Sequence, residues 1–197
     1  MYSQDNEEEI IKDHFGSKIG AFLDVGAADG MRFSNTRWLF EHGWSGVFVE
    51  PSPRQFLKLW ELYKDEPKAS LVNAALGEIE QLSVFHYCPD TMVNTLNEDV
   101  YQEWSRGGFK YSSWQICILS VYRFLLSFSQ EYDFISIDAE GESWKIALAF
   151  LHNEKFASLY CIEHDKDQAF GEKEMARYGY EKILENGNNT MWRRLQS

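Results

Sequence analysis

Basic residues are scarce in this sequence. Its 197 residues include 19 lysines and arginines against 31 aspartates and glutamates, which gives a formal net charge of −12. Proteins that grip nucleic acid non-specifically neutralise its phosphates with an excess of lysine and arginine, and docking on anionic lipid needs a similar excess. The charge therefore argues against both kinds of partner and predicts a cytoplasmic protein whose molecules repel one another.

Cysteine is also sparse. Cys88, Cys117 and Cys161 lie far apart in the sequence and form no C-x-x-C pair. A zinc site built on clustered thiolates uses such pairs, and an odd number of cysteines argues against a complete set of disulfides. We therefore expect a reducing compartment.

Long apolar runs are lacking as well. The longest, over residues 116–128, is interrupted by Ser120, Arg123 and Ser127, so it is not expected to span a bilayer. The first ten residues, MYSQDNEEEI, are acidic, whereas a signal peptide begins basic and continues apolar. We expect neither a membrane span nor a secretion signal.

Hydrophobic residues nevertheless make up 44% of the chain, enough for a sizeable core in one domain over residues 1–197. An N-terminal helical segment is expected within residues 1–19. Helices are also expected near Trp38 and after the segment Pro51-Ser52-Pro53, the latter burying Phe56, Leu57 and Trp60. The runs expected to form strands are AFLDV, WSGVFV, SLVNAAL, LSVFHY, YDFISI and ASLYCIE.

Strands that alternate with helices predict an α/β fold with a mostly parallel sheet and helices on both faces. The C-terminal segment, turning at residues 186–189, predicts an antiparallel hairpin at one end of this sheet. Residues 88–115 are polar and aromatic without a clear period. A long segment of this kind is typical of a functional lid, which we expect to cover the substrate.

Polar residues follow the first two expected strands. The segment Asp24-Val-Gly26-Ala27-Ala28-Asp29-Gly30 follows the first, and Glu50 follows the second. Glycines let a loop approach a ligand closely, and a carboxylate at the end of the second strand can accept both hydroxyls of a ribose. The loop has neither the G-x-G-x-x-G spacing of a dinucleotide site nor the Lys-Ser/Thr of a P-loop. A tight turn without a ligand would also use these glycines.

With these residues in view, the sequence resembles the FkbM type of class I methyltransferase, which depends on S-adenosylmethionine. The resemblance rests on FLDVGAADG, SNTRWLFEHGWSGVFVEPSP, LVNAALGE, ISIDAEGESW and CIEHD, in that order. Family members often have I-D-V-E-G where this chain has Ala139 in the third position. The resemblance covers the chain from about Ala21 onward and implies a Rossmann-like sheet.

The resemblance also implies roles for particular residues. The loop would surround the methionine part of S-adenosylmethionine, Glu50 would hold its ribose, and Pro51, Ser52, Asn73 and Ala74 would lie around its adenine. Asp138 would lie near the methionine amino group or the methyl acceptor. The complete set of expected cofactor contacts is Asp24, Gly26, Ala27, Ala28, Asp29, Gly30, Glu50, Pro51, Ser52, Asn73, Ala74 and Asp138.

Transfer of a methyl group to a hydroxyl benefits from a general base. Asp138, Glu140 and His164 follow strands on the expected ligand side, and imidazole ordinarily titrates near neutral pH. A histidine at a strand end can equally be structural, and a glutamate there can favour the start of a helix. Asp138 and Glu140 could also bind Mg²⁺ together with Glu163 or Asp165, but we expect no metal.

We therefore expect O-methylation of a hydroxyl on a saccharide or small secondary metabolite, as the FkbM resemblance implies. The expected partner is a small-molecule or glycan acceptor, without nucleic acid or membrane, and the oligomeric state is left open. One alternative is a non-catalytic Rossmann-like module that binds the cofactor or a protein partner. Another is an NAD-dependent oxidoreductase, which the spacing of the loop disfavours.

Overall fold

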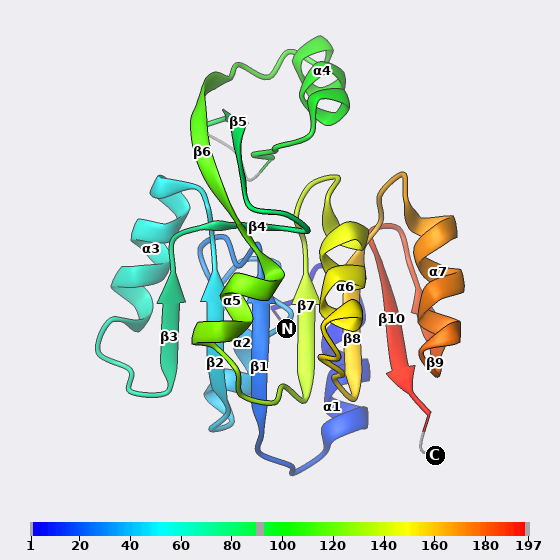
Figure 1. Cartoon of the computed structure of the whole chain (residues 1–197). Helices are drawn as coiled ribbons and strands as arrows, with labels where there is room; N and C mark the ends of the chain where they lie inside the picture. The colour runs from blue at the N-terminus through cyan, green and yellow to red at the C-terminus, as the bar shows by residue number, and fades with distance from the viewer. Residues whose placement is uncertain (1, 90–92, 196–197) are drawn as a thin grey trace.

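The structure is a computed structural model that describes residues 2–89 and 93–195 (Figure 1). Among these residues, one sheet of seven strands has the order β3-β2-β1-β7-β8-β10-β9. Its strands are β1 (Ala21–Val25), β2 (Ser45–Val49), β3 (Ala69–Val72), β7 (Phe134–Ile137), β8 (Leu159–Glu163), β9 (Tyr180–Glu185) and β10 (Asn189–Arg194). Strand β10 pairs antiparallel with β8 and β9, whereas the other neighbours are parallel. The mostly parallel sheet and the terminal hairpin are confirmed.

Helices cover both faces of this main sheet. The helices that cover it are α1 (Glu7–Phe15), α2 (Arg37–Glu41), α3 (Pro53–Tyr63), α5 (Val121–Ser127), α6 (Ser143–His152) and α7 (Gln168–Arg177). Helix α4 (Glu98–Arg106) lies above the sheet instead (Figure 1). Buried side chains of α1, α2 and α3 join one hydrophobic cluster, and those of α5, α6 and α7 join another. Helices on both faces of the sheet were predicted and are confirmed.

The central strands are apolar on both faces, and each contributes side chains to both hydrophobic clusters. In β1, Phe22 packs with α1–α3 while Leu23 and Val25 pack with α5–α7. Strand β7 divides in the same way, with Phe134 on the first side and Ile135 on the second. Successive side chains of a strand point to opposite faces, so a strand buried on both faces reads as a continuous apolar run.

Strand β1 occupies the switch point of the main sheet. It pairs with β2 on one side and with β7 on the other. Open α/β sheets bind ligands in the crevice outside the carboxyl ends of strands at such a point. The residues after β1, β2 and β7 are therefore placed to meet at one edge.

A second, smaller sheet lies above this edge (Figure 1). It has the order β4-β6-β5, with β4 (Ala75–Gly77), β5 (Gln81–Tyr87) and β6 (Ser112–Ser120). The prediction of one strand through SLVNAAL was wrong, because the chain leaves the main sheet after β3 and enters the small sheet at β4. Residues 88–115 contain α4 and the start of β6, so they have more regular structure than expected. Residues 90–92 of this expected lid lie outside the described part.

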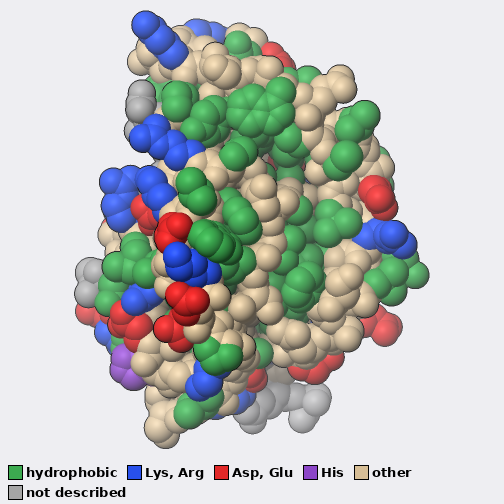
Figure 2. Space-filling model, turned by 90° about the vertical axis from the view of Figure 1, so that its left-hand side faces the viewer, with side chains coloured by type: hydrophobic (Ala, Val, Ile, Leu, Met, Phe, Trp, Pro, Cys, Tyr) green, Lys and Arg blue, Asp and Glu red, His purple; other side chains and the backbone are tan. Residues whose placement is uncertain are grey.

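Figure 2 views the side formed by α3 and the small sheet, where apolar side chains gather on the surface. Large exposed apolar residues of these elements are Leu57, Trp60, Leu82, Val84 and Trp114. The prediction that α3 buries Leu57 and Trp60 was wrong, since Leu59 and Tyr63 face the core instead. Within the described residues, no helix combines the length and the apolar character needed to cross a bilayer.

Candidate functional site

A cavity of about 410 Å³ lies at the carboxyl ends of β1, β2, β7 and β8, and residues of the small sheet and of α4 also line it. This volume falls in the range typical of sites for small molecules and cofactors. The sequence-predicted residues that line it are Asp24, Gly26, Ala27, Ala28, Glu50, Pro51, Ala74, Asp138, Glu140 and His164. The predicted residues that lie outside its lining are Asp29, Gly30, Ser52 and Asn73.

Gly26 allows the backbone after β1 to lie very close to the backbone of Asp138, at the end of β7. Its φ is +81°, and a Cβ built on it would lie 1.7 Å from the carbonyl oxygen of Asp138. Gly30 has φ +72° and packs against α3 instead, where an added Cβ would lie 2.7 Å from Leu59. The first glycine therefore joins the ends of β1 and β7, and the second supports the loop from behind.

Glu50 organises the loop after β1. Its side chain accepts hydrogen bonds from the backbone N–H of Ala28 (2.8 Å) and of Ser52 (2.7 Å). Its backbone carbonyl accepts one from the Asn73 side chain at 2.7 Å. Asn73 thus holds the Glu50 turn from outside the cavity. Burial raises the pKa of Glu50 to about 7, against the opposing effect of these backbone donors.

Asp24 is the second buried carboxyl beneath the loop, with 5% of its surface exposed. Thr36 donates its hydroxyl to Asp24 Oδ2 at 2.5 Å. Burial raises the pKa of Asp24 to about 7, although this hydrogen bond acts in the opposite direction. Hydroxyl residues before a helix ordinarily serve as caps, so nothing in the sequence marked Thr36 as a partner of Asp24.

Three further carboxyls meet at the ends of β7 and β8. Asp138, Glu140 and Glu163 each place an oxygen within 4.8 Å of the others. Restricted access to water raises the pKa of all three, and mutual repulsion adds to this effect for Glu140 and Glu163. Asp138, Glu140 and Glu163 all line the cavity. Such a cluster can share protons, and its oxygens are also of the type that binds Mg²⁺.

Asp165 does not join this cluster. Its side chain accepts the backbone N–H of Trp144 in the first turn of α6 and the N–H of Asp167. Glu163 instead accepts the Glu140 N–H and the Ser143 hydroxyl, both at 2.9 Å. Glu163 is therefore the residue of the two that contributes to the acid cluster.

Glu140 has an unusual backbone conformation, with φ +44°. Its N–H is bound by Glu163, and its carbonyl accepts the hydroxyl of Thr95 at 2.7 Å. Asn97 adds a bond to the Gly141 carbonyl at 3.2 Å. The segment before α4 therefore clamps the Glu140–Gly141 turn. Sequence reasoning missed Thr95 and Asn97, which lie in a stretch without periodic pattern.

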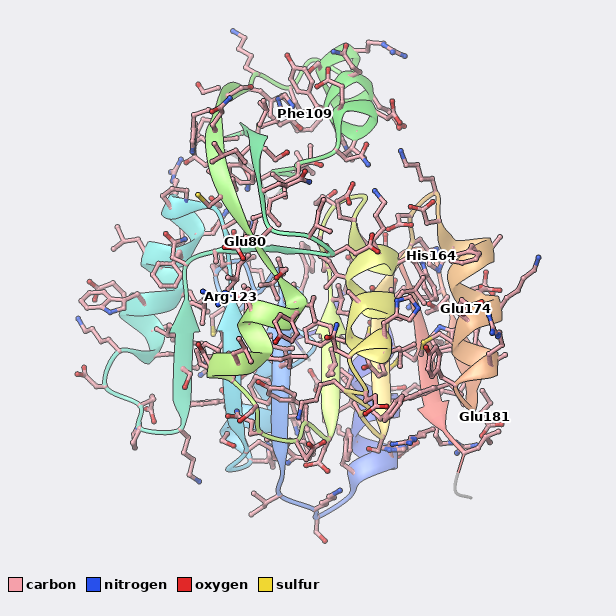
Figure 3. The ribbon with its side chains drawn as sticks, viewed as in Figure 1. Glu80, Phe109, Arg123, His164, Glu174 and Glu181 are labelled. Atoms are coloured by element: carbon pink, nitrogen blue, oxygen red, sulfur yellow. The ribbon has the colours of Figure 1, made fainter. Side chains whose placement is uncertain are left out.

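His164 follows β8 at the upper end of the sheet, between α6 and α7 in Figure 3. Its backbone N–H donates to the Asn188 carbonyl at 2.8 Å. Its Nε2 is shielded from solvent and has no hydrogen-bond partner among the described residues. The side chain lines the cavity.

Asn35 is another polar residue of the lining. Its Nδ2 donates to Ser136 at 3.2 Å, while Oδ1 is buried and lacks a partner within the described chain. An acceptor left in this state costs free energy unless a ligand or water supplies a donor. Sequence reasoning did not single out Asn35, so its position in the cavity was missed.

The buried carboxyls predict how stability depends on pH. The pKa of Asp24 and of Glu50 is raised on folding, so the stability associated with each is fully present below pH 4 and lost as the pH rises through 7. The free energy of unfolding in urea should be higher at pH 5 than at pH 8, by at least about 2 kcal/mol. Asp24→Asn should reduce this difference. If the free energy of unfolding changed by the same amount between pH 5 and pH 8 in Asp24→Asn and in the wild type, Asp24 would not be one of the groups responsible.

Thr95 and Asn97, which bind the Glu140–Gly141 turn, are called the clamp below. We predict that loss of the Thr95 hydroxyl from this clamp lowers the stability of the fold. Thr95→Val keeps the shape of the side chain but removes its bonds with the Glu140 carbonyl and the Asn97 N–H. Thr95 is 2% exposed, so water cannot replace them, and the free energy of unfolding should fall by about 1–3 kcal/mol. Thr95→Ser retains the hydroxyl and is the control. The clamp is refuted if serine costs as much as valine.

The cavity and its residues can now be compared with known proteins. A family model described as the methyltransferase FkbM domain matches residues 24–146, from the end of β1 into α6. This range includes the loop, Glu50, the clamp, Asp138 and Glu140. No curated protein sequence matches the chain.

Solved structures share the fold at low sequence identity. The FkbM methyltransferase of Methylobacillus flagellatus KT is 12% identical, with a TM-score of 0.55 over 89% of this chain and 44% of its own. The chain thus spans less than half of that protein's length. A putative methyltransferase of Escherichia coli is 11% identical, with a TM-score of 0.52 over 98% of this chain and 89% of its own.

A human methyltransferase 10 domain containing protein is 10% identical, with a TM-score of 0.51 over 98% of this chain and 81% of its own. At such identities the structures establish the fold, and the family model establishes the relationship. The Rossmann-like class I methyltransferase fold expected from the sequence is confirmed. The chain belongs to the FkbM methyltransferase family.

Proposed function

We propose that this methyltransferase uses S-adenosylmethionine to methylate a hydroxyl group on a saccharide or small secondary metabolite. The observation that carries the proposal is the set of carboxyls around one cavity of about 410 Å³, at the switch point of a methyltransferase sheet. S-adenosylmethionine supplies a methyl group already activated by a positively charged sulfur. A cavity rich in carboxylates suits such a cation.

The residues present fit this cofactor. Glu50 has two carboxylate oxygens, each with one backbone donor, so lone pairs are left for the ribose hydroxyls. Asn35 Oδ1 is a buried acceptor of the lining that lacks a donor within the described chain. Gly26, Ala27 and Ala28 line the cavity and leave room for a ligand, because glycine has no side chain and alanine only a methyl group. In this proposal Ser52, Asn73, Asp29 and Gly30 support the binding residues from behind.

Asp138 is the proposed base. Asp138 lines the cavity, and its pKa is raised toward the range useful at neutral pH, chiefly because the surrounding protein limits hydration of the carboxyl. A carboxylate oxygen of Asp138 would accept the proton of the acceptor hydroxyl as the oxygen becomes a nucleophile. Glu140 and Glu163 would adjust its charge. His164 is the weaker candidate because it lies outside the cluster of Asp138, Glu140 and Glu163.

The small sheet and residues 88–115 are proposed to cover the acceptor. Val93, Leu96 and Trp104 from this segment line the cavity together with Phe85 of β5. Apolar and aromatic walls with a few polar groups are typical of small-molecule sites. Phe109 lies higher in the same segment (Figure 3) and stacks edge-on with Trp104. The scarcity of lysine and arginine supports a neutral acceptor rather than nucleic acid.

Calorimetry with S-adenosylhomocysteine tests the cofactor. Wild-type protein should bind it, and Glu50→Gln should weaken binding at least about tenfold, since it removes the charge that orders the loop and contacts the ribose. Glu181→Gln is the matched control, because Glu181 pairs with Arg193 at the far end of the sheet (Figure 3). Absence of binding by wild-type protein would overturn the proposal.

Methyl transfer from radiolabelled S-adenosylmethionine to a panel of glycans and hydroxylated metabolites tests the reaction. At saturating cofactor, Asp138→Asn should lower kcat by about 10²–10⁴-fold, as expected for loss of a general base. His164→Gln should stay within about threefold of wild type, well below that range. Preserved turnover in Asp138→Asn would remove Asp138 from the mechanism. Cofactor binding without transfer to any acceptor would favour a non-catalytic binding module.

A further inference from the structure

The cavity has a strong imbalance of charge. The carboxyl side chains that line it are Asp24, Glu50, Asp138, Glu140, Glu142 and Glu163. Within the described part of the chain, Arg32 is the only lysine or arginine in the lining. Any ligand that carries a carboxylate therefore meets repulsion over most of the cavity and attraction near one side chain.

Arg32 is held in place by Asp29. Asp29 Oδ1 accepts the backbone N–H of Met31 at 3.1 Å and of Arg32 at 3.0 Å, which fixes the turn after Gly30. Asp29 Oδ2 lies 3.8 Å from Arg32 Nε. Asp29 was predicted to contact the cofactor, but it does not line the cavity. Its contacts instead orient Arg32, which does line the cavity.

We propose that Arg32 binds the α-carboxylate of the amino-acid end of S-adenosylmethionine. The inference rests on the proposed function, since it concerns the same cavity. The cofactor carries an ammonium and a carboxylate on one carbon. The carboxyls of the site can form ion pairs with the ammonium but not with the carboxylate. A guanidinium offers a planar pair of donors that matches a carboxylate.

The position of Arg32 in the chain agrees with this role. It comes two residues after the loop Asp24–Gly30, which walls the cavity beside Glu50. A ligand whose ribose lies at Glu50 would extend its amino-acid end along this loop. The Arg32 side chain is 66% exposed and also lines the cavity, so it borders both the solvent and the site.

The test compares two ligands that differ by the carboxylate alone. S-adenosylhomocysteine has it, whereas decarboxylated S-adenosylhomocysteine keeps the amine, the sulfur and the adenosine. Calorimetry should show that Arg32→Gln weakens binding of the first ligand about five- to tenfold and leaves the second within about twofold. Arg32→Lys keeps the charge without the fork and should fall between wild type and Arg32→Gln.

Arg177→Gln is the matched control, because it makes the same change of net charge at an exposed residue that pairs with Glu174 on α7. Raising the salt from about 0.05 to about 0.5 M NaCl should reduce the effect of Arg32→Gln, since the contact is exposed to screening. Equal weakening of both ligands, or of neither, would overturn the role of Arg32 while leaving the proposed function intact. Failure of the wild type to bind either ligand would overturn the proposed function itself, and this inference with it.

Discussion

The contact between Gly26 and Asp138 determines how the site is built. The backbone of the two residues approaches so closely that any side chain at Gly26 would overlap the Asp138 carbonyl. The same crossing is tied by hydrogen bonds from Gly26 N–H to Val49 and from Asp138 N–H to Val25, both at 2.9 Å. The ends of β1, β2 and β7 are thereby drawn together, and the carboxyls that follow them have to share one small space.

That crowding has an electrostatic consequence. Carboxyls that are buried or close to one another favour the protonated form, so ionising all of them together costs free energy. A cationic ligand removes part of this cost by pairing with the carboxylates, and the free energy released adds to its binding. On charge alone, the site therefore favours a positively charged ligand over one with several negative charges.

Sequence pattern was sufficient for the parts of the fold that depend on regular burial. Strands such as β1 and β7 are apolar on both sides, and the polar residues that follow them mark the edge of the sheet. The pattern failed at Asn73 and Ala74, where the chain changes from one sheet to another without a glycine or proline to mark the turn. It also failed in β6, whose first half is exposed and carries no alternation.

Within the site, the pattern identified residues whose chemistry is visible in a motif and missed those whose role depends on long-range contact. Asp24 and Glu50 stand directly after strands. Thr95 acts across 45 residues of sequence on Glu140, and nothing local distinguishes it from other threonines. Arg32 gains significance only from the acidic character of the cavity around it.

The clamp also links the small sheet to the chemistry of the cavity. Thr95 pairs with His86 of β5 through both backbone groups, at 2.9 and 3.0 Å, while its hydroxyl holds the Glu140 carbonyl. Lys166 after β8 adds an ion pair at 2.9 Å with Asp99 of α4. A displacement of the small sheet large enough to break these contacts would release a turn held at positive φ and so alter the spacing of the acid cluster. The small sheet with α4 and the carboxyls below it are thus parts of one structural unit.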